Sequence, residues 1–347
     1  MARRWQRRPE GSNWGEYGED DQVGRLNDVT PAKVLEGARE VREGRRFCLS
    51  LPLDYPGGNI LNARRFAPVL EPTYHGSDPA FCFPYDRLKP GATDVVCDDS
   101  VRIWLQYSTQ WDSFAHMGSQ FDADGDGVAE YVFYNGFRAG EHVVSPVDYR
   151  TGERLPEDRE AGALRLGIEH MAANGVQGRA VLIDLSPHFG RKRSLVGWSD
   201  LSEIMRRDRV EVEKGDMVLL HTGWAQAVLD ERKRPTAETL HDSHAALDGR
   251  DPGIQKWVVE SGLSVLIADN YAVEAHPSRP CDRHPCAMLP LHELCLFKLG
   301  VHLGELWHLT PLAEWLRAKK RSRFFLTAPP LRLPGAVGSP VTPIATV

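Results

Sequence analysis

The chain has 347 residues, of which 41% are hydrophobic and 26% charged, and a formal net charge of −6. This composition is typical of a soluble globular protein that can bury a large core without disulfide staples. The negative charge argues against a nucleic-acid-binding surface, which is normally basic. No run approaches the roughly 20 apolar residues of a membrane helix, and the basic N-terminus lacks the apolar segment of a secretory signal. We therefore expect a cytoplasmic protein that binds neither nucleic acid nor membrane.

The chain order predicts one large domain between two irregular ends. Residues 1–11 are charged and predict a disordered N-terminus, whereas residues 328–347 are rich in proline and glycine and predict an extended tail. No repeat or low-complexity linker interrupts residues 12–327, which we assign to a single domain. Cys281 and Cys286 flank His284 with a spacing that fits no standard zinc motif, so we expect free thiols there, with a zinc clip as the alternative.

The first half of the chain predicts strands but few helices between about residues 45 and 150, because proline and glycine are frequent there. Residues 100–112 (SVRIWLQYSTQWD) predict one strand with an apolar, core-facing row at odd positions. Its even row carries Gln106, Gln110 and Asp112, and His116 follows four residues after the aspartate. An Asp and a His at this distance can both ligate a metal, or the His can act as a general base that the Asp carboxylate orients. A solvated strand face is the alternative.

The next polar segment, FDADGDG (121–127), has the aspartate spacing of a calcium loop. An EF-hand needs a glutamate at its twelfth position, which is Phe133 here. We therefore interpret the segment as a turn-rich loop.

The second half alternates helical and strand patterns. Helices are expected over 162–175, 200–208 (with Asp200 as N-cap) and 253–262, and buried strands over 180–185, 216–223 and 264–269. This order predicts parallel strands joined by helical crossovers, with the irregular strand-rich part packed against them. The fold class is therefore α/β, with α+β as the alternative.

Residues 290–307 (PLHELCLFKLGVHLGELW) are expected to supply the distant half of a site. Pro290 suits the first turn of a helix and Gly300 its end. His292 lies on the apolar arc of that helix, so its side chain should point inward; a hydrogen-bonded core histidine is the alternative to a ligand. Glu305 follows in an apolar segment, and a buried carboxylate must be paired or bound to a metal.

On these residues the chain resembles the cyclase family of metal-dependent hydrolases, which includes bacterial kynurenine formamidase and isatin hydrolase. The family motif H-x-G-T-H-x-D-x-P-x-H falls on residues 106–116, where Thr109, Asp112 and His116 match, whereas Gln106 and Gln110 replace two histidines. This pattern is closer to a glutamine-bearing branch similar to trans-dienelactone hydrolase, a zinc enzyme. Residues 12–35, 134–137, 215–224 and 292–305 resemble further family blocks. The resemblance implies a single α/β domain of the swivelling β/β/α type.

The resemblance also implies an activity. We expect a metal-dependent hydrolase that activates water to cleave a lactone, ester or cyclic amide of a small substrate, with aromatic-derived compounds among the expected classes. A metal-dependent cyclase or lyase is one alternative, and a catalytically inactive binding relative is another. Family members are commonly homo-oligomers, and we expect the same here.

The expected site residues divide by role. The metal, Zn or Mn, is expected on Gln106, Gln110, Asp112, His116, His292 and Glu305, an oxygen-rich set because glutamine supplies a carbonyl oxygen where imidazole would supply nitrogen. His116 and Glu305 are the expected catalytic groups, His116 as general base. Gln106 and Gln110 are expected to orient water or stabilise an oxyanion, and Trp111, Phe114 and Tyr134 to line a pocket for a flat substrate.

Overall fold

The computed structural model describes residues 4–157, 159–282 and 284–347. Within these residues, the centre of the fold is a nine-stranded sheet with the order β1-β21-β19-β13-β15-β17-β18-β8-β20. Its strands are β1 (Arg46–Cys48), β8 (Gln110–Asp112), β13 (Gln177–Asp184), β15 (Met217–His221), β17 (Val265–Ala268), β18 (His302–Glu305), β19 (Arg323–Thr327), β20 (Gly338–Pro340) and β21 (Ile344–Thr346). The predicted parallel pairing is confirmed, because β13, β15, β17 and β18 pair in parallel. The flanking strands pair antiparallel.

Helices cover both faces of this sheet. They are α1 (Pro31–Ala38), α2 (Ile168–Asn174), α3 (Ser186–Phe189), α4 (Trp198–Asp208), α5 (Trp224–Asp230), α6 (Ala237–His241), α7 (Pro252–Glu260), α8 (Pro290–His292), which continues as a π-helical segment over Glu293–Leu299, and α9 (Thr310–Lys319). Along β13, Val181 and Ile183 belong to the same hydrophobic cluster as residues of α4 and α7, whereas Ala180 and Leu182 belong to the cluster that contains residues of α2 and α9. Successive side chains of a strand point to opposite faces, so the apolar runs bury both sides of the sheet. The α/β class is confirmed.

Two helix starts differ from the sequence expectations. The helix expected over 200–208 begins earlier, at Trp198, and its N-cap is Gly197 rather than Asp200. The helix expected over 162–175 begins only at Ile168, because Gly162–Ala163 forms strand β12. Capping residues are common throughout loops, so a cap pattern alone places a helix end only to within a few residues.

Residues 100–112 do not form the single strand that their alternation predicts. The first part is β7 (Asp99–Arg102), which pairs with β2 (Val69–Pro72) outside the main sheet, and only β8 joins that sheet. Val101, expected on a core face, is 52% exposed. The expectation failed because β7 belongs to a two-stranded ribbon that has no core beneath it.

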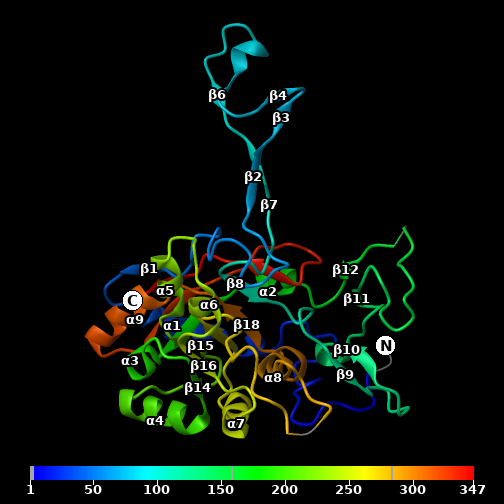
Figure 1. Cartoon of the computed structure of the whole chain (residues 1–347), viewed down its shortest axis with the longest axis vertical. Helices are drawn as coiled ribbons and strands as arrows, with labels where there is room; N and C mark the ends of the chain where they lie inside the picture. The colour runs from blue at the N-terminus through cyan, green and yellow to red at the C-terminus, as the bar shows by residue number, and fades with distance from the viewer. Residues whose placement is uncertain (1–3, 158, 283) are drawn as a thin grey trace.

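That ribbon is the base of an arm, defined here as residues 69–102, which stands away from the body of the molecule (Figure 1). Its other strands are β3 (Tyr74–His75), β4 (Asp78–Pro79), β5 (Phe83–Pro84) and β6 (Val95–Val96), with a short 3-10 turn at Tyr85–Arg87. Smaller strand pairs on the body are β9 (Ser119–Phe121) with β10 (Glu130–Val132), β11 (Val143–Val144) with β12, and β14 (Ser194–Val196) with β16 (Ala245–Leu247). Short 3-10 turns occupy Gly24–Asp28 and Tyr134–Gly136.

Both ends of the chain pack against the domain, which corrects the sequence expectation. Trp5 is buried and makes an edge contact with Trp14 at a ring-centroid distance of 5.7 Å, so residues 4–11 are ordered; residues 1–3 lie outside the described residues. The C-terminal segment supplies β20 and β21 to the main sheet. Its prolines are compatible with a sheet because Pro340 lies on the edge strand β20, where a missing N–H is tolerated.

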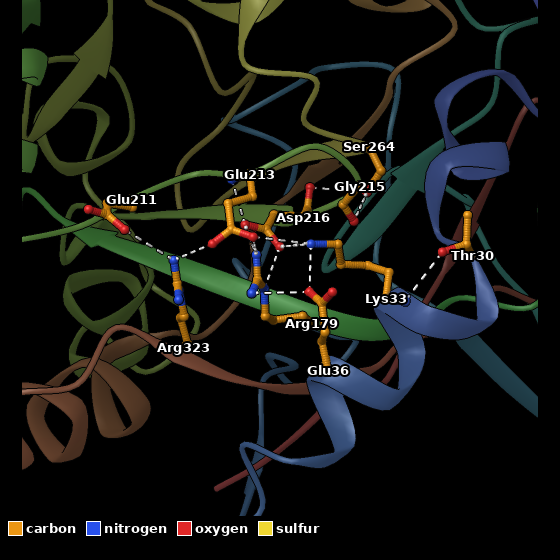
Figure 2. Close-up of polar contacts among 10 residues, drawn as sticks. All are labelled: Thr30, Lys33, Glu36, Arg179, Glu211, Glu213, Gly215, Asp216, Ser264 and Arg323. Carbon is orange, nitrogen blue, oxygen red and sulfur yellow. Dashed lines mark hydrogen bonds and ion pairs between the residues drawn. The ribbon is translucent and has the colours of Figure 1, made fainter.

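A buried ion-pair network fastens α1 to the sheet (Figure 2). Arg179 of β13 makes a bidentate contact with Asp216, with Nε at 2.7 Å from Oδ1 and Nη2 at 3.0 Å from Oδ2. The same guanidinium reaches Glu213 at 2.6 Å and Glu36 of α1 at 3.1 Å, and Lys33 of α1 contacts Glu36 at 2.8 Å. The network compensates the Asp216 carboxylate, which is fully buried.

Two local expectations have different outcomes. Cys281 and Cys286 form a disulfide with each other, so the expectation of free thiols is wrong; composition could not show that the two sulfurs meet across a loop. The segment at 121–127 is a turn-rich loop, as predicted: Asp122 accepts hydrogen bonds from the N–H groups of Gly125 and Gly127.

Among the described helices, none combines the length and apolarity that crossing a bilayer requires.

Candidate metal centre

Three buried side chains from distant parts of the sequence meet beside the β8–β18 pair. The register opposes Gln110 to Glu305 and Asp112 to Leu303, so Gln110, Asp112 and Glu305 share one face of the sheet. His292 reaches the same place from the end of α8. One ligand atom from each of Asp112, His292 and Glu305 lies within 4.8 Å of the others, and all three residues are buried.

Glycine at position 304 leaves room for the tryptophans on the face opposite the carboxylates. A Cβ atom at Gly304 would lie 3.0 Å from Nε1 of Trp307 and 3.1 Å from Cζ3 of Trp111. A side chain there would require these rings to shift by a few tenths of an ångström.

The Asp112 carboxylate is the group that most clearly needs a cation. Its residue is 0% exposed, and neither of its oxygens has a hydrogen-bond partner in the described part of the chain. Burial, and then the nearby Glu305 charge, raise the pKa of Asp112 well above its ordinary value. A buried carboxylate is stable as an anion only when it is paired or metal-bound, so the donor set fits a divalent ion.

His292 is held between two carboxylates. Its Nδ1 lies 2.9 Å from Oε1 of Glu274 and its Nε2 lies 3.2 Å from Oε1 of Glu305. The same Glu274 carboxylate accepts hydrogen bonds from the backbone N–H groups of Leu291 and His292. Although burial opposes the charged imidazole, these hydrogen bonds raise the pKa of His292 to about 10. The contact with His292 correspondingly lowers the pKa of Glu305, against the effect of burial.

Because Glu274 holds Nδ1, Nε2 is the ring atom that faces Glu305, and binding to a metal there would displace its proton. Glu274 thus has the position that an outer carboxylate occupies in carboxylate–histidine–metal arrangements, where it sets the tautomer and the ring orientation.

The two glutamines have different surroundings. Gln110 Nε2 donates to Oε2 of Glu305 at 3.1 Å, which leaves its buried Oε1 without a partner among the described residues. Gln106 has a buried Nε2 without such a partner, and this atom lies beside Gly338, the residue opposite Asp112 in the sheet. Gln110 therefore offers an oxygen, whereas Gln106 offers an N–H donor.

His116 lies at the outer side of the cluster. Its Nε2 is 3.9 Å from Oδ1 of Asp112, and its ring centroid is 6.5 Å from that of His292. Its side chain is 21% exposed, whereas that of Asp112 is 1% exposed. Burial, followed by the charge of His292, lowers the pKa of His116 to about 4, so this imidazole is neutral near pH 7.

The three aromatic residues expected to line a substrate pocket are core residues instead. Trp111 points to the opposite sheet face, where Nε1 donates to the carbonyl of Ala328. Phe114 stacks on His302 at 4.0 Å, and Tyr134 packs against Phe114 at 4.8 Å; all three aromatic residues are fully buried. For Trp111 the reason is strand alternation, since it lies on β8 between two residues that face the site; Phe114 and Tyr134 lie outside that strand.

Two charged residues near the cluster, Glu274 and Arg65, are not among the site residues predicted from the sequence. Glu274 stands 18 positions before His292, and no spacing rule joins them; the available signal was a carboxylate within the apolar run at 272–275. Arg65 donates from Nη1 to the backbone carbonyl of Gln106 at 2.6 Å. Its positive charge favours the ionised forms of Asp112 and Glu305. Nothing in the local sequence distinguishes Arg65 from its neighbour Arg64.

The chain is similar to known proteins in sequence and in fold. The family model named Cyclase, described as "Putative cyclase", matches residues 49–275. The structure is similar to a crystal structure of a novel cyclase, with 28% identity, a TM-score of 0.72 and 97% of each chain covered. No curated protein is similar enough to count as a match.

Two isatin hydrolases share the fold. Isatin hydrolase A from Labrenzia aggregata, bound to benzyl benzoate, is 14% identical with a TM-score of 0.53, covering 91% of this chain and 98% of that chain. Isatin hydrolase A from Ralstonia solanacearum is 17% identical with a TM-score of 0.52, covering 91% and 95%. Identities this low show the fold alone. Because the family model matches well over half of the residues, the chain belongs to the cyclase family.

Proposed function

We propose that the chain is a metal-dependent hydrolase that cleaves a lactone, ester or cyclic amide bond of a small substrate. The observation that carries the proposal is the fully buried Asp112 carboxylate, which lacks a hydrogen-bond partner in the described chain and lies beside His292 and Glu305. The isatin hydrolases that share the fold support it, since isatin contains a cyclic amide.

Asp112, His292 and Glu305 would hold the metal, with Oε1 of Gln110 as a further donor, and His116 stays off the metal so that its imidazole can accept a proton. This mixture of carboxylate, amide and imidazole donors suits Zn or Mn. When bound, a divalent ion would supply Lewis acidity, which acidifies water and polarises a carbonyl group.

The protein side chains would do the remaining work. His116 is neutral near pH 7 and accepts a proton as general base. Gln106 donates from its free Nε2 to the oxygen that becomes negative as the substrate carbonyl is attacked. Glu274 acts as a positioning residue, because it holds the His292 ring in one orientation. We also propose that the glutamine pattern places the chain in a branch similar to trans-dienelactone hydrolase.

Metal analysis combined with a substrate screen tests the proposal. His292→Ala and Glu305→Gln should each abolish turnover and lower the bound metal. His188→Ala should change neither, because His188 lies on α3 and pairs with Asp208 of α4. The screen should contain lactones, imides and aryl formamides. Wild-type metal content and turnover in both site variants would refute the proposal.

The mass of the product separates hydrolysis from the cyclase or lyase alternative. Hydrolysis gives products whose summed mass exceeds the substrate mass by one water, whereas a cyclase or lyase leaves the summed mass of the organic products unchanged or reduced. Protein that binds no metal and turns over no compound in the screen would favour a binding relative.

A further inference from the structure

The tip of the arm brings two thiols together. In the antiparallel β5–β6 pair, Phe83 opposes Val96 and Pro84 opposes Val95. One step further along this register, Cys82 stands opposite Cys97. Their Sγ atoms lie 3.8 Å apart, and both residues are exposed. A disulfide bond is about 2.05 Å long, so closing it requires the sulfurs to approach by about 2 Å.

The surroundings of this pair make a covalent link structurally important. None of the described arm residues belongs to the hydrophobic clusters of the body. The tip is held by a small group of rings, with His75 and Phe83 at 4.7 Å and Phe83 and Tyr85 at 6.4 Å. Isolated two-stranded ribbons are marginally stable in water, and small units without a core are usually stabilised by cross-links. A Cys82–Cys97 bond would close the loop that contains β5 and β6.

We propose that Cys82 and Cys97 are a dithiol modification site, which a low-molecular-weight disulfide such as oxidised glutathione converts into an intramolecular disulfide. One protein thiolate attacks a sulfur of the reagent, forms a mixed disulfide and releases one glutathione thiolate. The second protein thiolate then attacks the protein sulfur of that mixed disulfide and releases the second glutathione. The two thiol protons pass to the released thiolates, so the protein is oxidised by two electrons and the reagent is reduced by two.

The geometry also assigns the order of attack. The backbone N–H of Cys82 donates to Sγ of Cys97 at 3.1 Å, which stabilises negative charge on that sulfur. The hydrogen bond with Cys97, and then its charge, raise the pKa of Cys82. Since the thiolate is the reactive form, Cys97 attacks first and Cys82 resolves the mixed disulfide.

The other thiols provide controls within the same chain. Cys48 is exposed but has no neighbouring thiol among the described residues, and Cys295 is buried. Cys48 should therefore stop at a mixed disulfide, and Cys295 should not react in the folded protein.

Peptide mapping of the full-length protein tests the proposal without any measurement of activity. The protein is treated with oxidised glutathione, free thiols are alkylated, and the chain is digested with trypsin without reduction. Cleavage after Arg65, Arg87 and Arg102 places Cys82 in the peptide 66–87 and Cys97 in the peptide 88–102. We expect these two peptides to be joined, at a mass two hydrogen atoms below their sum, and to separate on reduction.

Single variants test the order of attack. Cys82→Ser should trap glutathione on Cys97, Cys97→Ser should leave Cys82 to react more slowly, and Cys48→Ser should not alter the 82–97 link. Separate glutathione adducts on Cys82 and Cys97 in the wild type, or two unreacted thiols, would overturn the proposal. Because the wild-type map suffices for this decision, poor folding of a variant does not obscure it.

Discussion

Replacement of Arg179 by methionine should be among the most destabilising single changes on this fold. Methionine retains most of the aliphatic volume but removes the guanidinium that contacts Asp216, Glu213 and Glu36 (Figure 2). Asp216 would then be a buried carboxylate without its bidentate partner. Removing one partner of a buried ion pair costs about 3–5 kcal/mol.

The remaining contacts place the expected loss at the lower end of this range. Asp216 still accepts a hydrogen bond from the backbone N–H of Glu213 at 2.7 Å, and the Lys33 ammonium stays 3.6 Å away. We therefore expect Arg179→Met to lower the free energy of unfolding by about 3 kcal/mol. Urea denaturation followed by circular dichroism at pH 7 measures this change.

Arg206→Met is the matched control. Arg206 makes the same kind of bidentate contact, with Glu203 at 2.6 and 3.0 Å, but its side chain is 74% exposed. Water screens exposed ion pairs, so the control should lose much less stability. Equal losses in the two variants, or a loss below about 1 kcal/mol for Arg179→Met, would show that burial of Asp216 does not set the strength of the network.

Two further predictions concern carboxylates whose pKa values are shifted in opposite directions. In chelator-treated protein, Asp112→Asn should raise the free energy of unfolding at pH 7 by about 1–3 kcal/mol, because it removes a buried unpaired charge, and it should abolish stabilisation by added Zn²⁺ or Mn²⁺. Since the pKa of Asp112 is raised, this gain should vanish below pH 3.8, and a variant that is less stable without metal would contradict the assignment. Glu213→Gln should lower stability at pH 7 by about 0.2–1 kcal/mol. The contact with Arg179 lowers the pKa of Glu213 below 4.5. The contribution of Glu213 to stability is therefore complete above pH 4.5 and is lost as the pH falls through the lowered pKa. A stability difference between wild type and variant that persists at about pH 2 would refute this.

The predictions that succeeded depend on patterns within a few residues, whereas those that failed depend on contacts between distant segments. Residues 180–185 and 264–269 were predicted as buried strands because short apolar runs between turn residues suit a sheet that is covered on both faces. His292 was predicted to point inward because Pro290 and Gly300 bound one helix whose apolar arc contains it. These predictions succeeded because the information lies within a few residues. For 100–112, alternation correctly placed Gln110 and Asp112 on one face, but it could not show that the first part of the segment pairs outside the sheet.

The sequence by itself determined the α/β class, the parallel pairing of neighbouring central strands and the polar groups that belong to the candidate centre. Only the tertiary structure decided that Glu274 orients His292, that Trp111 faces the core, and that the last twenty residues complete the sheet. The physical reason is that periodicity records which side chains share a face, whereas burial depends on what another segment places against that face. Asp112 and Glu305 became neighbours only through the antiparallel pairing of β8 with β18, across a separation of 193 residues that no local pattern spans.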